Sequence, residues 1–214
     1  MLLGASNVFS IDFSSQEDRM SAYITRDPTD VADFIAGKDV HQELANRLEI
    51  SSRDVAKRIR HATRYGMKVN SLSKTLGIPY SEAERLYDTY RIKYERTFFF
   101  ATSLRVQDEF YTPVLGRQIK MSTYKEHTKF NWVVQGSCSD LLLKALNYVL
   151  ESKEVELRSH FHDSLYLACL CKDPHPGCEQ SKKVVEEIEN LYWFKWPGTK
   201  ERVFKFGEIE WKGG

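Results

Sequence analysis

Apolar and polar residues alternate in short stretches near both ends of the chain and recur at helical spacing in the middle. The alternating stretches predict strands over 8–13, 155–161, 165–171 and 202–211. Helical spacing predicts helices over 15–25, 30–36, 40–48, 53–65, 71–76, 79–109, 124–151 and 179–192. Pro113 and Gly116 indicate a hairpin-like segment within 111–121. This order predicts an α+β fold, a small antiparallel sheet interrupted by a large helical insertion.

Composition is that of a soluble globular protein, with 42% hydrophobic and 29% charged residues among 214. The formal net charge of +1 gives no overall basic field. The sequence contains no apolar run of about 18 residues, so no membrane span is predicted. The first residues lack the pattern of a signal peptide. Four cysteines are too few to predict a disulfide scaffold at this length, so a reducing, cytoplasmic setting is expected.

Basic residues nevertheless gather in and directly after one predicted helix. Six of them lie between Arg53 and Lys68, against the single acid Asp54. Arg53, Lys57 and His61 recur every four residues, so they share one helical face. An Arg and a Lys one turn apart suit the phosphates of a triphosphate. A solvated basic face explains the same pattern and is the more common outcome.

Two aspartates stand beside predicted strand ends, Asp12 and Asp163. If their strands pair, both carboxylates face one point, where two divalent ions could bridge an attacking hydroxyl and a departing pyrophosphate. Either aspartate alone is more simply a cap or turn residue. The pair is therefore a hypothesis that depends on strand pairing.

Six motifs follow one another along the chain. They read Asp12-Phe13-Ser14-Ser15-Gln16-Glu17-Asp18-Arg19; Gly37-Lys38-Asp39-Val40-His41; Arg53-x3-Lys57-x7-Tyr65-Gly66 with Leu72-Ser73-x2-Leu76-Gly77-Ile78; Thr112 with Gly116-Arg117; Asn131-x3-Gln135-Gly136-x3-Asp140; and His162-Asp163. In this order they resemble the motifs of family A (polymerase I-like) DNA polymerases, especially the phage versions. The resemblance covers essentially the whole chain from residue 8.

The resemblance implies template-directed DNA synthesis, in which dNTPs are added to a primer 3′-hydroxyl by two-metal nucleotidyl transfer. Asp12 and Asp163, with the backbone carbonyl of Phe13, would hold two Mg²⁺ ions. Contacts with the dNTP are implied for Glu17, His41, Arg53, Lys57, His61 and Tyr65, where Glu17 is the steric gate against ribonucleotides. Contacts with primer-template DNA are implied for Arg19, Gly66, Arg117, His127, Asn131, Gln135 and His162.

The resemblance also implies domains: palm over 1–36, fingers over 37–110 and palm again over 111–214. Family members carry a thumb, and often an exonuclease-like domain, before the first motif, whereas Met1 lies eleven residues ahead of Asp12. We therefore expect the thumb and exonuclease domains to be absent here. The expected protein is the C-terminal part of a split polymerase in a bacterial or phage-infected cell, completed by a separate N-terminal subunit that carries the thumb.

Three positions depart from the family's pattern. His61 stands where the family commonly has Phe or Tyr, and His127 replaces an Arg that contacts DNA. Ser164 replaces a Glu after the hairpin Asp, so we expect weaker metal affinity rather than inactivity. The stretch between His41 and Arg53 is also short, which implies a trimmed fingers subdomain.

Two other functions compete with DNA synthesis. A single-subunit RNA polymerase shares the palm and fingers, but Glu17 and the 37–41 segment argue against it. A non-catalytic DNA-binding or assembly module could retain the fold. Retention of Asp12, Asp163, Arg53 and Lys57 together argues against that second alternative.

Two further clusters attract attention. Cys169-x-Cys171-x3-His175-x2-Cys178 holds four soft ligand types, but its spacing fits no common zinc pattern, so we expect buried cysteines without a metal role. Phe98, Phe99 and Phe100 are expected in the core, or at an interface with the missing domains.

Overall fold

The computed structural model describes residues 7–172, 174, 178–192 and 194–212. The chain forms two compact units, unit 1 from residues 1–20 and 138–214 and unit 2 from residues 21–137. Helices α1 (Gln16–Thr25) and α8 (Lys129–Glu151) each contain one of the two points where the chain passes between units. His175 of the cysteine-histidine cluster lies outside the described residues.

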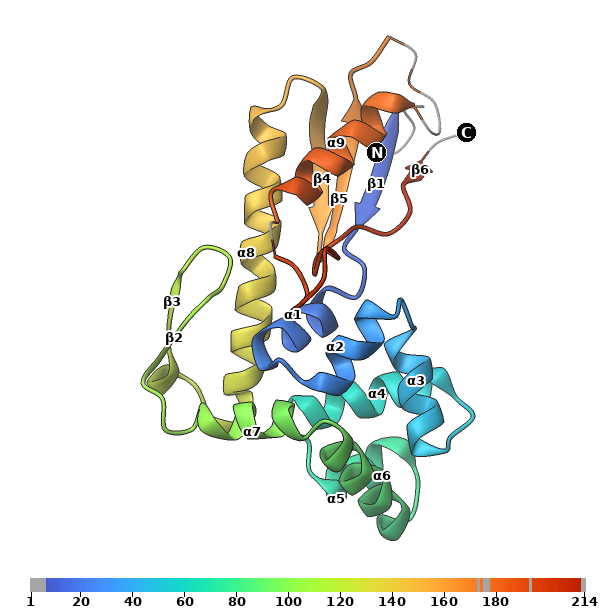
Figure 1. The fold of residues 1–214 in the computed structure, drawn as a ribbon, viewed down its shortest axis with the longest axis vertical. Coiled ribbons are helices and arrows are strands. Elements are labelled where there is room, and N and C mark those ends of the chain that lie inside the picture. The colour runs from blue at the N-terminus through green and yellow to red at the C-terminus, as the bar shows by residue number, and fades with distance from the viewer. Residues whose placement is uncertain (1–6, 173, 175–177, 193, 213–214) are drawn as a thin grey trace. The chain divides into compact units, whose positions relative to one another are not determined.

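Unit 1 is built on a four-stranded sheet of order β4-β5-β1-β6 (Figure 1). Its strands are β1 (Val8–Asp12), β4 (Val155–Phe161), β5 (Ser164–Cys169) and β6 (Glu210–Lys212), and β1 runs antiparallel to both of its neighbours. The first four residues of β1 are buried, as expected of a central strand. The strand predicted over 202–211 is shorter in the structure, where β6 begins only at Glu210.

Helix α9 (Glu179–Asn190) belongs to the same unit and buries Ser181, Val184 and Ile188 on one face. Figure 1 shows α9 drawn across the strands of the sheet. The side chain of Gln180 donates to the carbonyl of Glu154, 3.0 Å away, just before β4. The hydroxyl of Tyr192 donates to the carbonyl of Leu141 in α8 at 2.7 Å. These bonds fasten α9 and the segment after it to the rest of unit 1.

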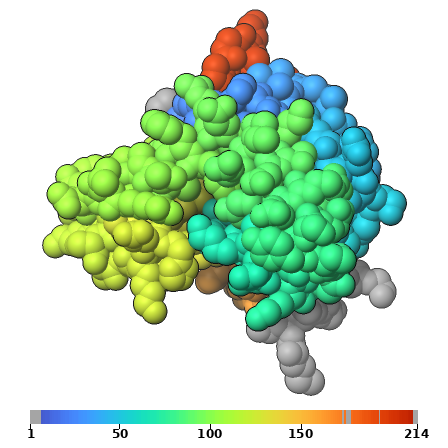
Figure 2. Space-filling model, turned by 90° about the horizontal axis from the view of Figure 1, so that it is seen from below, coloured from blue at the N-terminus to red at the C-terminus, as the bar shows by residue number. Residues whose placement is uncertain are grey.

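Unit 2 is mainly helical. Its elements are α2 (Pro28–Ile35), α3 (Val40–Leu48), α4 (Arg53–Arg64), α5 (Val69–Leu76), α6 (Tyr80–Lys93), α7 (Glu95–Ser103), the hairpin β2 (Glu109–Tyr111) and β3 (Gln118–Lys120), and the 3₁₀ turns η1 (Met121–Thr123) and η2 (Glu126–Thr128). Figure 2 shows one face of this unit, with α6 and α7 in green and the β2–β3 segment in yellow-green. Leucine, isoleucine, alanine and tyrosine side chains of α3 to α6 form its core.

The α+β prediction is confirmed, and most of the expected elements are present. The single helix expected over 79–109 is wrong, because the chain breaks at Tyr94 into α6 and α7. The break leaves the backbone N–H of Thr97 without a helical acceptor, and the Asp27 carboxylate accepts it at 3.1 Å. Tyr94 itself is fully buried and stacks on Tyr90 with 4.7 Å between ring centroids.

The three consecutive phenylalanines in α7 have different surroundings. Phe98 packs edge-on against Tyr90 in the core of unit 2, at 5.7 Å. Phe100 makes a similar contact with Phe110 of β2, at 6.3 Å. Phe99 is 76% exposed. The core expectation therefore fits Phe98 and Phe100 but not Phe99.

A buried ion pair crosses the inside of unit 2. Nη2 of Arg60 lies 2.5 Å from Oδ1 of Asp30, and Nη2 of Arg64 lies 3.8 Å from Oδ2 of the same carboxylate. All three side chains are fully buried. Burying a charge is costly unless it is paired. Here the Asp30 carboxylate supplies the partner for two buried guanidinium groups.

Among the described residues, no helix is both long and apolar enough to cross a membrane.

Asp30→Asn should destabilise the chain strongly, because it leaves two guanidinium groups buried beside a neutral amide. We expect a loss of about 3–5 kcal/mol in the free energy of unfolding, measured by urea denaturation. The matched control is Asp54→Asn, since Asp54 is 80% exposed and its contact with Arg53 is 3.9 Å. That change should cost about 1 kcal/mol or less. Equal losses in the two variants would contradict a structural role for the buried pair.

Asp27 gives a second prediction, about pH. Burial raises the pKa of Asp27, and so does the charge of Asp30. Backbone hydrogen bonds, including those from Thr97 and Thr29, act to lower this pKa but do not outweigh the increase. A carboxyl with a raised folded-state pKa contributes stability below its unfolded pKa, and this contribution is lost as pH rises through the folded pKa.

Asp27→Asn keeps an acceptor oxygen and cannot ionise. Its stability relative to wild type should therefore increase as pH rises from below the ordinary aspartate pKa of about 3.9 to neutrality. Urea denaturation across that range measures the difference. A difference that stays constant or shrinks with rising pH would refute the assignment.

Candidate functional site

Strand pairing in unit 1 brings Asp12 and Asp163 together. Asp12 at the end of β1 is the register partner of Ser164 at the start of β5. The backbone N–H of Phe13 donates to the carbonyl of Asp163 at 3.3 Å. The hydroxyl of Ser164 donates to Oδ1 of Asp12 at 2.5 Å. Two carboxylates far apart in the sequence thus meet at one end of the sheet.

The turn between β4 and β5 presents Asp163. Phe161 pairs with Ser164, so His162 and Asp163 form a two-residue connection, and the second strand begins one residue earlier than predicted. His162 has a φ of 53°, in the left-handed region that side chains rarely occupy. Its ring packs edge-on against Phe161 with centroids 4.3 Å apart. Strained backbone of this kind is concentrated at functional sites.

Negative charge accumulates at this end of unit 1. Burial raises the pKa of Asp163, and the nearby charge of Asp12 raises it further. The buried thiol of Cys138 has a pKa well above its ordinary value, first because of burial and then because of the charges of Glu17, Asp163 and Asp18. A group of neighbouring carboxylates is an environment that a divalent cation stabilises.

The start of α1 supplies the other site residues of unit 1. Gln16 donates to the carbonyl of Cys138 at 3.5 Å, which fixes the first turn beside α8. Glu17 is partly exposed. Arg19, which was predicted to contact DNA, is buried and donates to the carbonyls of Ser14 at 2.8 Å and Val203 at 3.1 Å. Burial lowers the pKa of Arg19 to about 10, although the charge of Asp18 acts in the opposite direction.

Unit 2 carries the predicted phosphate contacts on α3 and α4. Ser52 caps α4 by accepting from the N–H of Val55 at 3.2 Å. Asp39 caps α3 and accepts from the backbone N–H of His41 at 2.9 Å. Its other oxygen accepts from Nε of Arg53 at 2.7 Å. Burial alone would raise the pKa of Asp39, but the Arg53 hydrogen bond and the cap bonds lower it.

Asp39 therefore holds His41 and Arg53 together, a role that the sequence reasoning missed. The signal was available, since an Asp directly before a helical pattern is a preferred N-cap.

Aromatic rings extend from these residues along α4. The ring centroids of His41 and His61 are 5.9 Å apart, and those of His61 and Tyr65 are 6.3 Å apart. Tyr65 lies 6.3 Å from Phe130 of α8. His61 thus lies within a row of rings formed by side chains of α3, α4 and α8.

The expected basic surface on α4 is smaller than the sequence indicated. Arg60 and Arg64 point inward to Asp30, so they cannot meet a ligand's phosphates. The cations left exposed are Arg53, Lys57, Arg58 and Lys68. The prediction of six surface cations is wrong for two of them, because one face of α4 is part of the core.

Gly66 and His127 lie side by side in unit 2. Gly66 has a φ of 89°, and a Cβ built there would stand 2.9 Å from the carbonyl oxygen of His127. Both the backbone conformation and the close approach therefore require glycine. A cavity of about 240 Å³ is lined in part by Gly66, His127 and the exposed Lys68.

The remaining DNA candidates meet at the first part of α8. Nη2 of Arg117 donates to the carbonyl of Gly136 at 2.7 Å. A Cβ at Gly136 would lie 3.0 Å from Cδ1 of Ile119, so this glycine lets the β2–β3 segment approach the helix. Asn131 and Gln135 are one helical turn apart, Asn131 partly buried and Gln135 exposed.

Comparisons with known proteins point to one family. The sequence pattern of DNA polymerase family A matches residues 3–192. DNA polymerase I of Thermus filiformis is 30% identical over 210 residues, which covers 86% of this chain and 25% of that protein. DNA polymerase I of Deinococcus radiodurans is 24% identical, covering 86% and 22%. A DNA polymerase of Mycobacterium phage L5 is 24% identical, covering 73% and 27%.

A solved structure shares the fold. It is the POL domain of Pol1 from M. smegmatis in complex with DNA primer-template and dNTP, with a TM-score of 0.78 and 19% identity. The match covers 99% of this chain and 41% of that one. The chain thus spans about a quarter of the length of the curated relatives above, whose shares are 22%, 25% and 27%. Because the family pattern matches most of the sequence, the chain belongs to DNA polymerase family A.

Proposed function

We propose that this chain carries out template-directed DNA synthesis, adding dNTPs to a primer 3′-hydroxyl. The observation that supports it most directly is the meeting of Asp12 and Asp163, which depends on the β1–β5 register. Membership of DNA polymerase family A supports the same activity.

The carboxylate end of unit 1 fits divalent metal ions. Oxygen ligands suit Mg²⁺, and the raised pKa of Asp163 reflects burial and a neighbouring negative charge. Asp12, Asp163 and the backbone carbonyl of Phe13 would hold two ions. When bound, the ions would lower the pKa of the primer hydroxyl and neutralise charge on the triphosphate.

The chain's own residues would orient the reactants. In unit 2, Arg53 and Lys57 would bind the triphosphate, with Asp39 holding the Arg53 side chain in place. His41 would add a third phosphate contact. His61 and Tyr65 would pack against the incoming nucleotide as part of the row of rings. In unit 1, Glu17 would exclude a ribose 2′-hydroxyl.

Contacts with the primer-template duplex are proposed at the remaining positions. Arg117, His127, Asn131 and Gln135 belong to unit 2, where Gly66 lets the backbone approach His127 closely. His162 stands beside Asp163 in the hairpin of unit 1. Arg19 would act indirectly, by fixing the backbone around Ser14 from inside the unit.

We further propose that a separate N-terminal chain carrying the thumb completes the enzyme. The chain spans about a quarter of its relatives' length. Size measurement combined with primer extension tests this, since a monodisperse monomer that extends primers unaided would disprove it.

The phage-type assignment also stays a prediction, because phage and bacterial relatives match at similar identity.

Asp163→Asn tests the catalytic assignment. The assay is primer extension with Mg²⁺, by the chain alone and with candidate N-terminal chains. The extension rate should fall by on the order of 10²–10³-fold or more. Binding of primer-template DNA, followed by fluorescence anisotropy, should persist. The matched control is Asp88→Asn on the exposed side of α6, which should retain full extension. Extension unchanged in Asp163→Asn would refute the metal assignment.

Glu17→Ala tests the choice of sugar and separates DNA synthesis from the RNA polymerase alternative. The ratio of kcat/KM for rNTP to that for dNTP should rise by about 10–100-fold, because the space for a 2′-hydroxyl opens. Glu84→Ala, at an exposed position of α6, should leave the ratio unchanged. A wild-type chain that prefers rNTPs would instead favour the RNA polymerase reading.

A further inference from the structure

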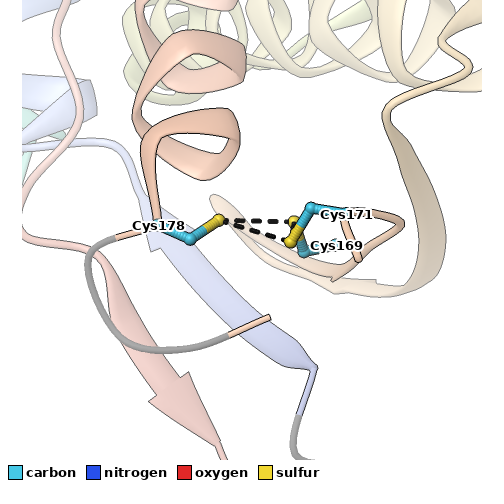
Figure 3. Close-up of side chains that lie close together, drawn as sticks. All are labelled: Cys169, Cys171 and Cys178. Atoms are coloured by element: carbon cyan, nitrogen blue, oxygen red, sulfur yellow. Dashed lines mark hydrogen bonds between the residues drawn. The ribbon is translucent and has the colours of Figure 1, made fainter. Parts of the chain in front are cut away.

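Three cysteine thiols lie together in unit 1, away from the sequence motifs of the proposed polymerase site. Cys169 is the last residue of β5, Cys171 follows it, and Cys178 is the N-cap of α9. The Sγ–Sγ distances are 3.1 Å between Cys169 and Cys171, 3.5 Å between Cys169 and Cys178, and 3.7 Å between Cys171 and Cys178. Figure 3 shows the three sulfur atoms converging.

These distances approach those of thiolates on one metal ion. Zn–S bonds of about 2.3 Å in tetrahedral geometry place two sulfurs about 3.8 Å apart. The three sulfurs are therefore close enough to share an ion after small movements. Cys169 and Cys178 are buried, whereas Cys171 is partly exposed and would give the ion access from solvent.

The start of α9 orients one of these sulfurs. The backbone N–H of Ser181 donates to Sγ of Cys178 at 3.4 Å, so a positive partial charge lies against this thiol. A thiol at a helix N-terminus is readily converted to the thiolate, which is the form that binds zinc.

We propose that Cys169, Cys171 and Cys178 bind a single Zn²⁺ ion that fastens the end of β5 to the start of α9. Binding replaces the protons of the thiols, so Zn²⁺ and three thiols give a zinc tris-thiolate and up to three released protons. The ion stays in one oxidation state, and one tetrahedral position remains for a fourth ligand.

The site would brace the strand that carries the carboxylate hairpin. β5 begins at Ser164, directly after Asp163, and ends at Cys169. Its far end is also held by the N–H of Cys169, which donates to the carbonyl of Asn7 at 2.9 Å. A metal tie at Cys169 would therefore act on the same strand from the end opposite to Asp163.

The sequence alone did not favour this site, because Cys169 and Cys171 are separated by one residue instead of the two to four usual for zinc pairs. Folding supplies the third ligand from a helix cap. The three ligands meet because the end of a strand lies beside the start of a helix, and the spacing of cysteines in the sequence does not reveal this.

Metal content is the first test. The full chain is purified with a phosphine reductant and passed into metal-free buffer. Inductively coupled plasma mass spectrometry should then find about one zinc ion per molecule. Cys169→Ser and Cys178→Ser should lose it. Cys138→Ser is the matched control, because Cys138 is a buried free cysteine in α8 outside the cluster, and this variant should keep the zinc. Asp163→Asn should keep it as well.

Cobalt binding tests the wild-type chain directly, and so remains decisive if a serine variant fails to fold. Adding Co²⁺ to the zinc-free chain should produce sulfur-to-cobalt charge-transfer absorption, which added Zn²⁺ removes. Absence of both zinc and this absorption would overturn the proposal. So would an intact mass showing that two of the three cysteines are joined as a disulfide in the reduced preparation.

Discussion

The antiparallel pairing of β1 with β5 is the interaction on which the candidate catalytic site depends. It sets Asp12 opposite Ser164 and therefore beside Asp163, although the two aspartates belong to opposite ends of the sequence. Side chains in a strand alternate between faces, so a slip of one residue would turn Asp12 to the opposite face. Val8 lies on one face of β1, and Phe9 and Ile11 lie on the other. All three are fully buried, so a slip would also force both faces of the strand to repack.

That register is held from both sides of β1, which matters because two neighbouring carboxylates repel each other. The carbonyl of Asp12 accepts from the N–H of Gly207 at 2.8 Å, while Phe13 donates to Asp163. The Phe13 ring packs on Phe206, with centroids 4.4 Å apart. Apolar packing directly after Asp12 therefore offsets the electrostatic cost of the site. The arrangement resembles other functional sites, where local strain or repulsion is tolerated because the surroundings over-determine it.

Local signals explain why much of the fold was predictable. The helix over 40–48 and the strand over 155–161 have the predicted bounds, because a cap or a turn marks each end. The break at Tyr94 was not predictable from local sequence, since the Asp27 carboxylate that accepts from the N–H of Thr97 after the break lies far away in the sequence. The same limit applies to α4, whose sequence could not tell which cations face the core. Asp30, which is distant in the sequence, lies within reach of Arg60 and Arg64 and offsets the cost of burying them.

The candidate site was predictable as an ordered set of motifs, but not its balance of charge. Ser164 stands where the family has a glutamate, and its hydroxyl donates to Asp12 at 2.5 Å. A glutamate could not donate when ionised and would add a third negative charge beside Asp163. Serine therefore lowers repulsion in the absence of an ion, while it also removes a ligand for one. The expected result is a carboxylate pair that tolerates an empty state better and would hold divalent ions less tightly, because Asp12 would have to give up its bond to Ser164 or share it if an ion bound.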